Sequence, residues 1–139
     1  MKKFLLASIV VGCAVTSVKG QAPNIVSYTL DTFAQGATSP MQSTPYQSTS
    51  IACNQVAPTV PTSVTNPTKF FFDDAANVGK VCIGTLGGTW LQAIPNGPGY
   101  YVTLTQTDNI GNTSARSAGS NPFVRQGNPA VVTNVRVIP

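Results

Sequence analysis

Apolar and polar residues alternate with a period of two over several short stretches of the chain, which is the pattern of strands that bury one face. The clearest stretch runs from Tyr100 to Thr107, and an earlier one places Val26, Tyr28 and Leu30 on one face. No stretch of twelve residues has a convincing helical period, and Gly or Pro interrupts nearly every candidate. The pattern therefore predicts an all-β chain.

Turn residues separate these stretches at short intervals. Further strands are expected at residues 48–55, 68–73 and 80–86, and residues 114–125 are expected to return as the partner of 100–107 after a turn at 108–112. The run Phe70-Phe71-Phe72 is too apolar to face water on both sides, so we expect 68–73 to be a central strand. Short strands with turn signals roughly every eight to twelve residues predict a sandwich or barrel.

Residues 1–20 have the features of a secretory signal peptide, with a positive start followed by the apolar run Phe4–Val15. Cleavage after Gly20 would leave Gln21 as the first residue, whereas a lipobox that ends at Cys13 would place a lipid on that cysteine. Both alternatives predict export from a bacterial cell, to the extracellular space or the cell surface, or to the outer membrane as a lipoprotein. No later stretch is apolar for long enough to be a transmembrane helix.

Most of the basic excess of the chain lies in this leader. The formal charge of the full sequence is +4, but only five basic residues follow residue 20, against four acidic ones. These five are scattered singly along the chain, so we expect no nucleic-acid partner and contact with a membrane only through a lipid on Cys13. His and Glu, which are common general bases and metal ligands, are absent from the sequence, so neither an enzyme nor a cofactor is expected.

Two cysteines follow the leader. In the oxidising compartment that the leader predicts, Cys53 and Cys82 are expected to form a disulfide. A zinc site is not expected, because two cysteines without a histidine supply too few ligands.

The stretch at residues 99–114 reads GYYVTLTQTDNIGNTS. Over about residues 99–123 the chain resembles the last hairpin of bacterial immunoglobulin-like and fibronectin type III-like domains. The resemblance implies an immunoglobulin-like antiparallel β-sandwich over residues 21–127, with Tyr100 as the candidate for the tyrosine corner. Trp90 follows Cys82 instead of lying between two cysteines, so no relationship to antibody domains is implied.

Residues 128–139 hold a further alternating stretch, in which Val131, Thr133, Val135 and Val137 share one face. The fold implied by the resemblance does not require this extra C-terminal strand, which resembles the opening strand of a following fibronectin type III-like domain. Unpaired strand edges are prone to pair with other strands. Three alternatives stay open: an extra edge strand in its own sandwich, addition to a sheet of another copy, and a disordered tail.

Two weaker candidate sites are also present. Oxygen ligands for calcium could come from Asp73, Asp74 and Asn77, although the same residues fit a solvated turn. A flat platform for sugars could be formed by Trp90, Tyr46 and Tyr101, although core packing explains such aromatic residues equally well.

These observations predict an exported structural or adhesive surface protein whose partners are copies of itself or other surface proteins. Strand addition through the terminal strands, Val26, Tyr28 and Leu30 at one end and the 128–139 segment at the other, would build a filament. The alternatives are a carbohydrate-binding accessory domain that contacts glycans, and a monomeric outer-membrane lipoprotein with a protein partner.

Overall fold

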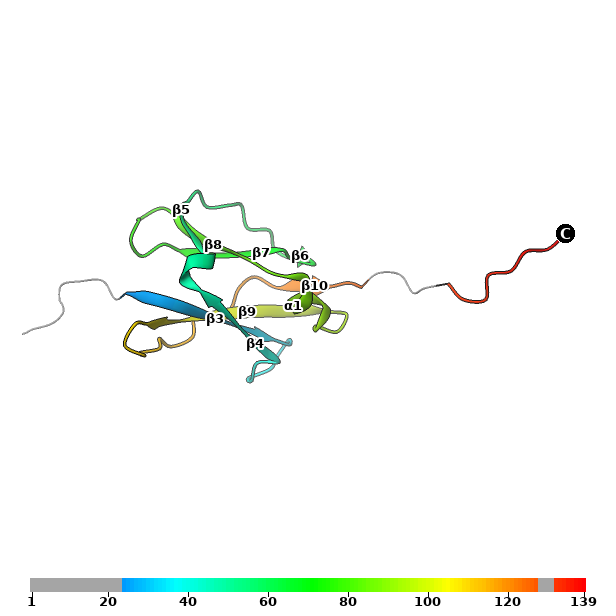
Figure 1. The fold of residues 1–139 in the computed structure, drawn as a ribbon, viewed down its shortest axis with the longest axis horizontal. Coiled ribbons are helices and arrows are strands. Elements are labelled where there is room, and N and C mark those ends of the chain that lie inside the picture. The colour runs from blue at the N-terminus through cyan, green and yellow to red at the C-terminus, as the bar shows by residue number, and fades with distance from the viewer. Residues whose placement is uncertain (1–23, 128–131) are drawn as a thin grey trace, which may run out of the picture.

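Two β-sheets pack face to face in the computed structural model, which describes residues 24–127 and 132–139 (Figure 1). Nearly all strand pairs are antiparallel, and the all-β sandwich predicted from the alternating pattern is confirmed. The predicted leader, including Cys13, lies outside the described residues. No helix within 24–127 and 132–139 is long and apolar enough to cross a membrane.

The larger sheet has five strands. Its order is β4 (Gln42–Gln47), β3 (Ile25–Phe33), β9 (Gly97–Asp108), β10 (Phe123–Arg125) and β6 (Val64–Thr65). The strand β3 pairs with β4 on one side and with β9 on the other, so it has no free edge along most of its length. Tyr28 and Leu30 point from β3 into the core, where they are 8% and 1% exposed.

The smaller sheet has three strands, in the order β5 (Ala52–Gln55), β8 (Val81–Thr85) and β7 (Lys69–Asp73). The prediction of a central strand at 68–73 is therefore wrong, because β7 lies at the edge of this sheet. Phe70 is buried, whereas Phe71 and Phe72 are only half-buried. A strand with the composition of an interior strand thus occupies an edge.

Two short helices connect the strands, namely η1 (Ser48–Ser50) and α1 (Gly88–Gln92). The helix α1 is not predicted by the sequence pattern, since a single turn is too short to display a helical period. It carries Trp90 into the core, where the indole packs on Phe123 with ring centroids 5.4 Å apart.

Residues 114–122 follow β9 without forming a strand, so the predicted partner strand 114–125 is wrong except at β10. In this stretch, which we call the serine segment, Ser114, Ser117 and Ser120 recur at every third position. Each serine N–H donates to a β9 carbonyl, and each hydroxyl accepts the N–H of the same β9 residue at 3.0 Å. The serines thus make the hydrogen bonds to the edge of β9 that a neighbouring strand would otherwise make.

One arginine fastens the serine segment to the outer face of the larger sheet. The Nε of Arg116 donates to an oxygen of Asp31 at 2.8 Å, and the guanidinium lies 5.2 Å from the ring centroid of Phe33. Asp31 is only 5% exposed and also accepts the hydroxyl of Ser43, so its charge is paired and hydrogen bonded. These contacts fix the segment against the sheet.

Residues 132–139 lie apart from both sheets. All eight are exposed, and none of them is in a strand. Figure 1 shows this stretch projecting beyond the end of β10, away from the sandwich. For the described part of 128–139, the alternative of an extra edge strand in its own sandwich is therefore wrong, while Val131 lies outside the described residues.

Candidate functional site

A groove of about 950 Å³ opens between the two sheets along the free side of β7. The strand β7 forms one wall, and the serine segment forms the other through Ala115 and Ala118. The loop at residues 58–61 also lines the groove, and its Pro61 C=O accepts the side-chain N–H of Asn121 at 2.8 Å. Core side chains such as Leu30 and Leu104 line its base. The groove thus opens toward the core, where Leu104 is partly exposed and Leu30 is buried.

The backbone of β7 has one side available along this groove. Leu86 N–H donates to Thr68 C=O, and Asp74 N–H donates to Lys80 C=O, so the even-numbered residues face β8. Because ladder hydrogen bonds alternate along an antiparallel pair, the N–H and C=O groups of 69, 71 and 73 point away from β8. Outside the ladder with β8, none of these groups has a hydrogen bond within the described part of the chain.

At one end, the chain that crosses between the sheets closes the groove. Val64 N–H donates to Pro122 C=O, and Asn66 N–H donates to Val124 C=O, which hold β6 beside β10 before the chain passes into β7. Asn66 also exchanges side-chain hydrogen bonds with the backbone of Gln126. The strand that leads toward residues 132–139 therefore ends close to the start of β7.

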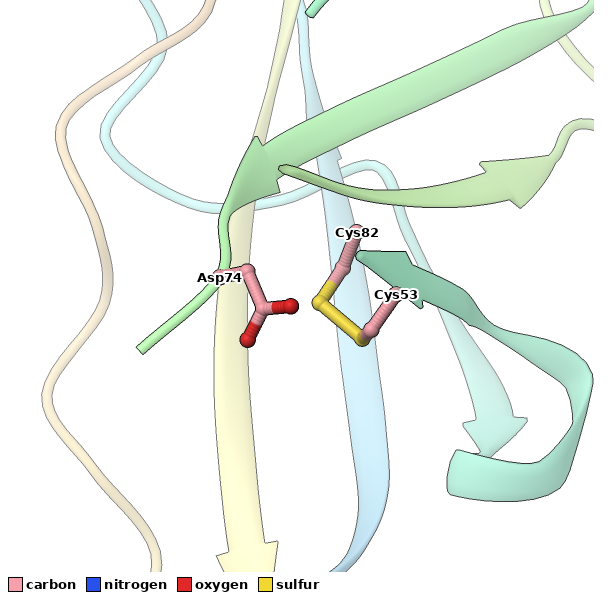
Figure 2. Close-up of side chains that lie close together, drawn as sticks. All are labelled: Cys53, Asp74 and Cys82. Carbon is pink, nitrogen blue, oxygen red and sulfur yellow. A yellow bond between two sulfur atoms is a disulfide. The ribbon is translucent and has the colours of Figure 1, made fainter. Parts of the chain in front are cut away.

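The predicted disulfide is present and joins β5 to β8 (Figure 2). A closed loop with a sequence separation of 29 residues stabilises a fold by about 3 to 4 kcal/mol on the chain-entropy model. Its Cα atoms are 3.9 Å apart at a bulge where Asn54 has a φ of 63°. The disulfide fixes the small sheet, of which β7 is the free edge.

Asp74 lies beside this disulfide at the end of β7 (Figure 2). Its carboxylate accepts the side-chain N–H of Asn77 at 2.8 Å and the backbone N–H groups of Asn54 and Ala76 at 2.9 Å. The hydrogen bond from the Asn77 side chain, supported by those from the backbone, lowers the pKa of Asp74 below its usual value of 3.8, against the opposing effect of burial. Asp74 is therefore a structural carboxylate that holds the bulge.

Only two of the three residues of the candidate calcium site are in contact. Asp74 and Asn77 are in contact, but the Asn77 amide offers its N–H group to the carboxylate instead of an oxygen to an ion. Asp73 is exposed on the opposite face of β7. Cys53 and Cys82, the other potential ligands near Asp74, are bonded to each other and supply no thiolate. These contacts correspond to the turn alternative, although Asp74 is buried and not solvated.

The aromatic candidates do not share a surface. Trp90 is 5% exposed, and its Nε1 donates to the hydroxyl of Thr32 at 2.9 Å. Tyr46 packs against Phe70 with ring centroids 5.1 Å apart, and its hydroxyl donates to the backbone of β8. Tyr101 lies on the outer face of the larger sheet, stacked on Phe33. They form no flat platform.

The two sets of candidate assembly residues have different outcomes. Tyr28 and Leu30 are core residues of an interior strand, and Val26, on the same strand, is 37% exposed. Val135 and Val137 are 80% and 95% exposed, and Thr133 lies in the same exposed stretch. Only the C-terminal set is available for pairing.

Sequence reasoning missed the edge position of β7 and the role of the three serines. The spacing of Ser114, Ser117 and Ser120, with Ala115 and Ala118 after the first two, is a three-residue period that conflicts with a strand. That period was the signal in the sequence that residues 114–122 do not form a strand. The edge position of β7 has no local signal, because it depends on which strands the rest of the chain supplies.

Comparison with known proteins gives no relative. No family model matches the chain, and no similar sequence among curated proteins or similar fold among solved structures was found. The Tyr100 hydroxyl donates to the carbonyl of Pro95, five residues upstream, at 2.8 Å, while the immunoglobulin-like topology stays a prediction.

Proposed function

We propose that this protein is an exported bacterial surface subunit, structural or adhesive, that assembles with copies of itself by strand addition. The observation that carries the proposal is the 132–139 stretch, which alternates apolar and polar residues yet is exposed throughout. Val132, Val135, Val137 and Ile138 are each at least 80% exposed. Apolar side chains so arranged gain free energy when the stretch pairs with a sheet edge.

The surface chemistry supports the same proposal. Only 9% of the residues are charged, and the five basic residues after the leader nearly balance the four acidic ones. Copies of such a chain repel one another weakly, because long-range repulsion depends on net charge. The disulfide and the predicted leader support export.

Deletion of residues 128–139 tests the proposal. The full chain should form oligomers whose mass rises with concentration, whereas the deletion variant should stay a folded monomer, because 132–139 are exposed in the structure. Multi-angle light scattering gives the mass, and circular dichroism with thermal melting reports the fold. A full chain that stays monomeric at all concentrations would contradict the proposal.

A further inference from the structure

We infer that the free edge of β7 and its groove are the acceptor for residues 132–139 of a neighbouring copy. The inference rests on the proposed function and names the surface through which the copies meet. In the assembled state the donated strand lies beside β7 and turns the three-stranded sheet into a four-stranded one.

The sequence of β7 fits an interior strand. Three consecutive phenylalanines leave no polar face, yet Phe71 and Phe72 are only half-buried in the single chain. A strand laid along this edge covers the exposed parts of both rings and closes the groove over core residues such as Leu104. The added strand therefore removes from water the apolar surface that the fold leaves open.

The backbone of β7 is also ready for pairing. The N–H and C=O groups of Lys69, Phe71 and Asp73 point away from β8, and outside that ladder they have no hydrogen bonds within the described residues. The outward groups of these three residues are regularly spaced, because the β7–β8 register has no bulge. An added strand can therefore form a regular ladder with them.

Other edges of the described sandwich are less suited to accept a strand. The strand β4 carries Pro45, β5 is bulged at Asn54, and β6 spans only two residues. Proline, bulges and short length each interrupt the ladder that an added strand needs.

The opposite wall of the groove is closed to pairing by the serine segment. Each serine hydroxyl accepts a β9 N–H and donates to the carbonyl of the residue that follows the serine. The β9 groups on this side are thus already hydrogen bonded. Ala115 and Ala118 present only methyl groups to the groove, which leaves room for larger side chains from a donor.

The donor stretch matches this acceptor in length, polarity and charge. Once Asn134, whose φ is 56° in the single chain, becomes extended, the eight residues of the strand span about 26 Å, more than the five residues of β7 require. When Thr133, Val135 and Val137 face the groove, Arg136 lies on the outer face of the sheet. On that face β7 carries exposed Lys69 at one end and exposed Asp73 at the other, so the charges match in the register that places Arg136 beside Asp73.

The occupant is a second copy because the donor points away from its own groove. Figure 1 shows residues 132–139 extending outward beyond the sandwich, while β7 runs back across it. Donor and acceptor are different surfaces of one molecule, so each copy that gives a strand can also receive one, and the chain of copies stays open unless its rotation closes a ring.

A proline at Phe71 tests the acceptor. The variant Phe71→Pro removes an N–H that points to the free edge and none that β8 uses, so the monomer should fold with the ladder intact. Phe71→Ala is the matched control, because it removes the same ring and keeps the N–H. We expect Phe71→Ala to retain assembly and Phe71→Pro to lose it, as measured by light scattering.

A mixing experiment then assigns the two roles. Phe71→Pro keeps a donor without an acceptor, and the 128–139 deletion keeps an acceptor without a donor. Each alone should be monomeric, and the mixture should give a one-to-one heterodimer. Assembly of Phe71→Pro at the level of the full chain would overturn the acceptor assignment and leave the proposed function standing, whereas a full chain that never assembles would remove both.

Hydrogen exchange on the unmodified chain gives a test that does not depend on the folding of a variant. In the assembled full chain, the amides of Lys69, Phe71 and Asp73 should exchange more slowly than in the deletion variant. Equal exchange rates in the two samples would overturn the inference. Slow exchange at these amides in a full chain that stays monomeric would show that each molecule fills its own groove, which also overturns it.

Discussion

Trp90 and Asp74 are two buried side chains that join parts of the fold far apart in sequence. The indole of Trp90 links α1 to Thr32 on β3, whose side chain is fully buried. The carboxylate of Asp74 links the end of β7 to the bulge at Asn54 on β5. In both residues the polar atoms are hydrogen bonded, which offsets the cost of removing them from water.

Replacement of Trp90 tests its role as a core residue. Trp90→Ala should lower the free energy of unfolding by about 3 to 5 kcal/mol, because it removes a large buried side chain and leaves a cavity. Trp90→Phe should cost less, since a ring still fills the site and the Thr32 hydroxyl alone loses its partner. Urea denaturation followed by circular dichroism measures both. A Trp90→Ala variant as stable as the unmodified chain would place the indole outside the core.

Acid should weaken the contacts of Asp74. The pKa of Asp74 lies below the usual 3.8 in the folded state, so the charged carboxylate stabilises the fold at pH values above 3.8. This stabilisation is lost as the pH falls through the lowered pKa. Asp74→Asn should therefore be less stable than the unmodified chain at pH 7, and the difference should shrink toward pH 2. Thermal melts across this range measure it, with Asp108→Asn as the comparison, because hydrogen bonds from Asn112 also lower the pKa of Asp108. A difference that is independent of pH would contradict this role.

At the scale of elements, the two walls of the groove are sheet edges treated in opposite ways. The edge of β9 is satisfied by serine hydroxyls and serine N–H groups in a three-residue repeat. The edge of β7 carries three phenylalanines and leaves its outward backbone groups free of protein partners within the described part of the chain. One edge is therefore protected against further pairing, and the other is left open to it.

The serine contacts should be visible one amide at a time. Ser117→Ala removes the acceptor of the Leu104 N–H, so that amide should exchange faster, and the fold should lose about 0.5 to 1.5 kcal/mol. Ser117→Thr keeps the hydroxyl and serves as the control. The amides of Thr103 and Thr105, which face β3, should exchange at unchanged rates. Equal acceleration along the whole of β9 would indicate general loosening instead of a local contact.

The sequence predicted much of this arrangement, because strand alternation and turn residues are local signals. It placed Tyr28, Leu30 and Tyr100 in strands of a sandwich and paired Cys53 with Cys82 correctly. It misplaced β7 because three phenylalanines identify a strand that needs cover on both sides, while residues 24–127 and 132–139 supply a neighbour on one side only. The groove itself could not be predicted, because it arises from the absence of a strand between elements distant in sequence.

The molecule as a whole is a sandwich with an open groove and a separate, exposed stretch of strand-like sequence at residues 132–139. The groove and residues 132–139 are different surfaces of one chain, and a contact between unlike surfaces repeats without closing unless its rotation forms a ring. Low charge and a disulfide are consistent with the proposed packing of copies outside the cell. The proposed strand addition thus explains why a strand of interior character lies at an edge of the single chain.

Electron microscopy of the purified protein tests the central claim most directly. Negative staining of the full chain should show filaments in which each sandwich contacts two others, and the 128–139 deletion under the same conditions should show only single particles. Filaments that persist after the deletion would contradict assembly through the C-terminal stretch. Single particles in both samples, at concentrations where the protein stays folded, would contradict self-assembly itself.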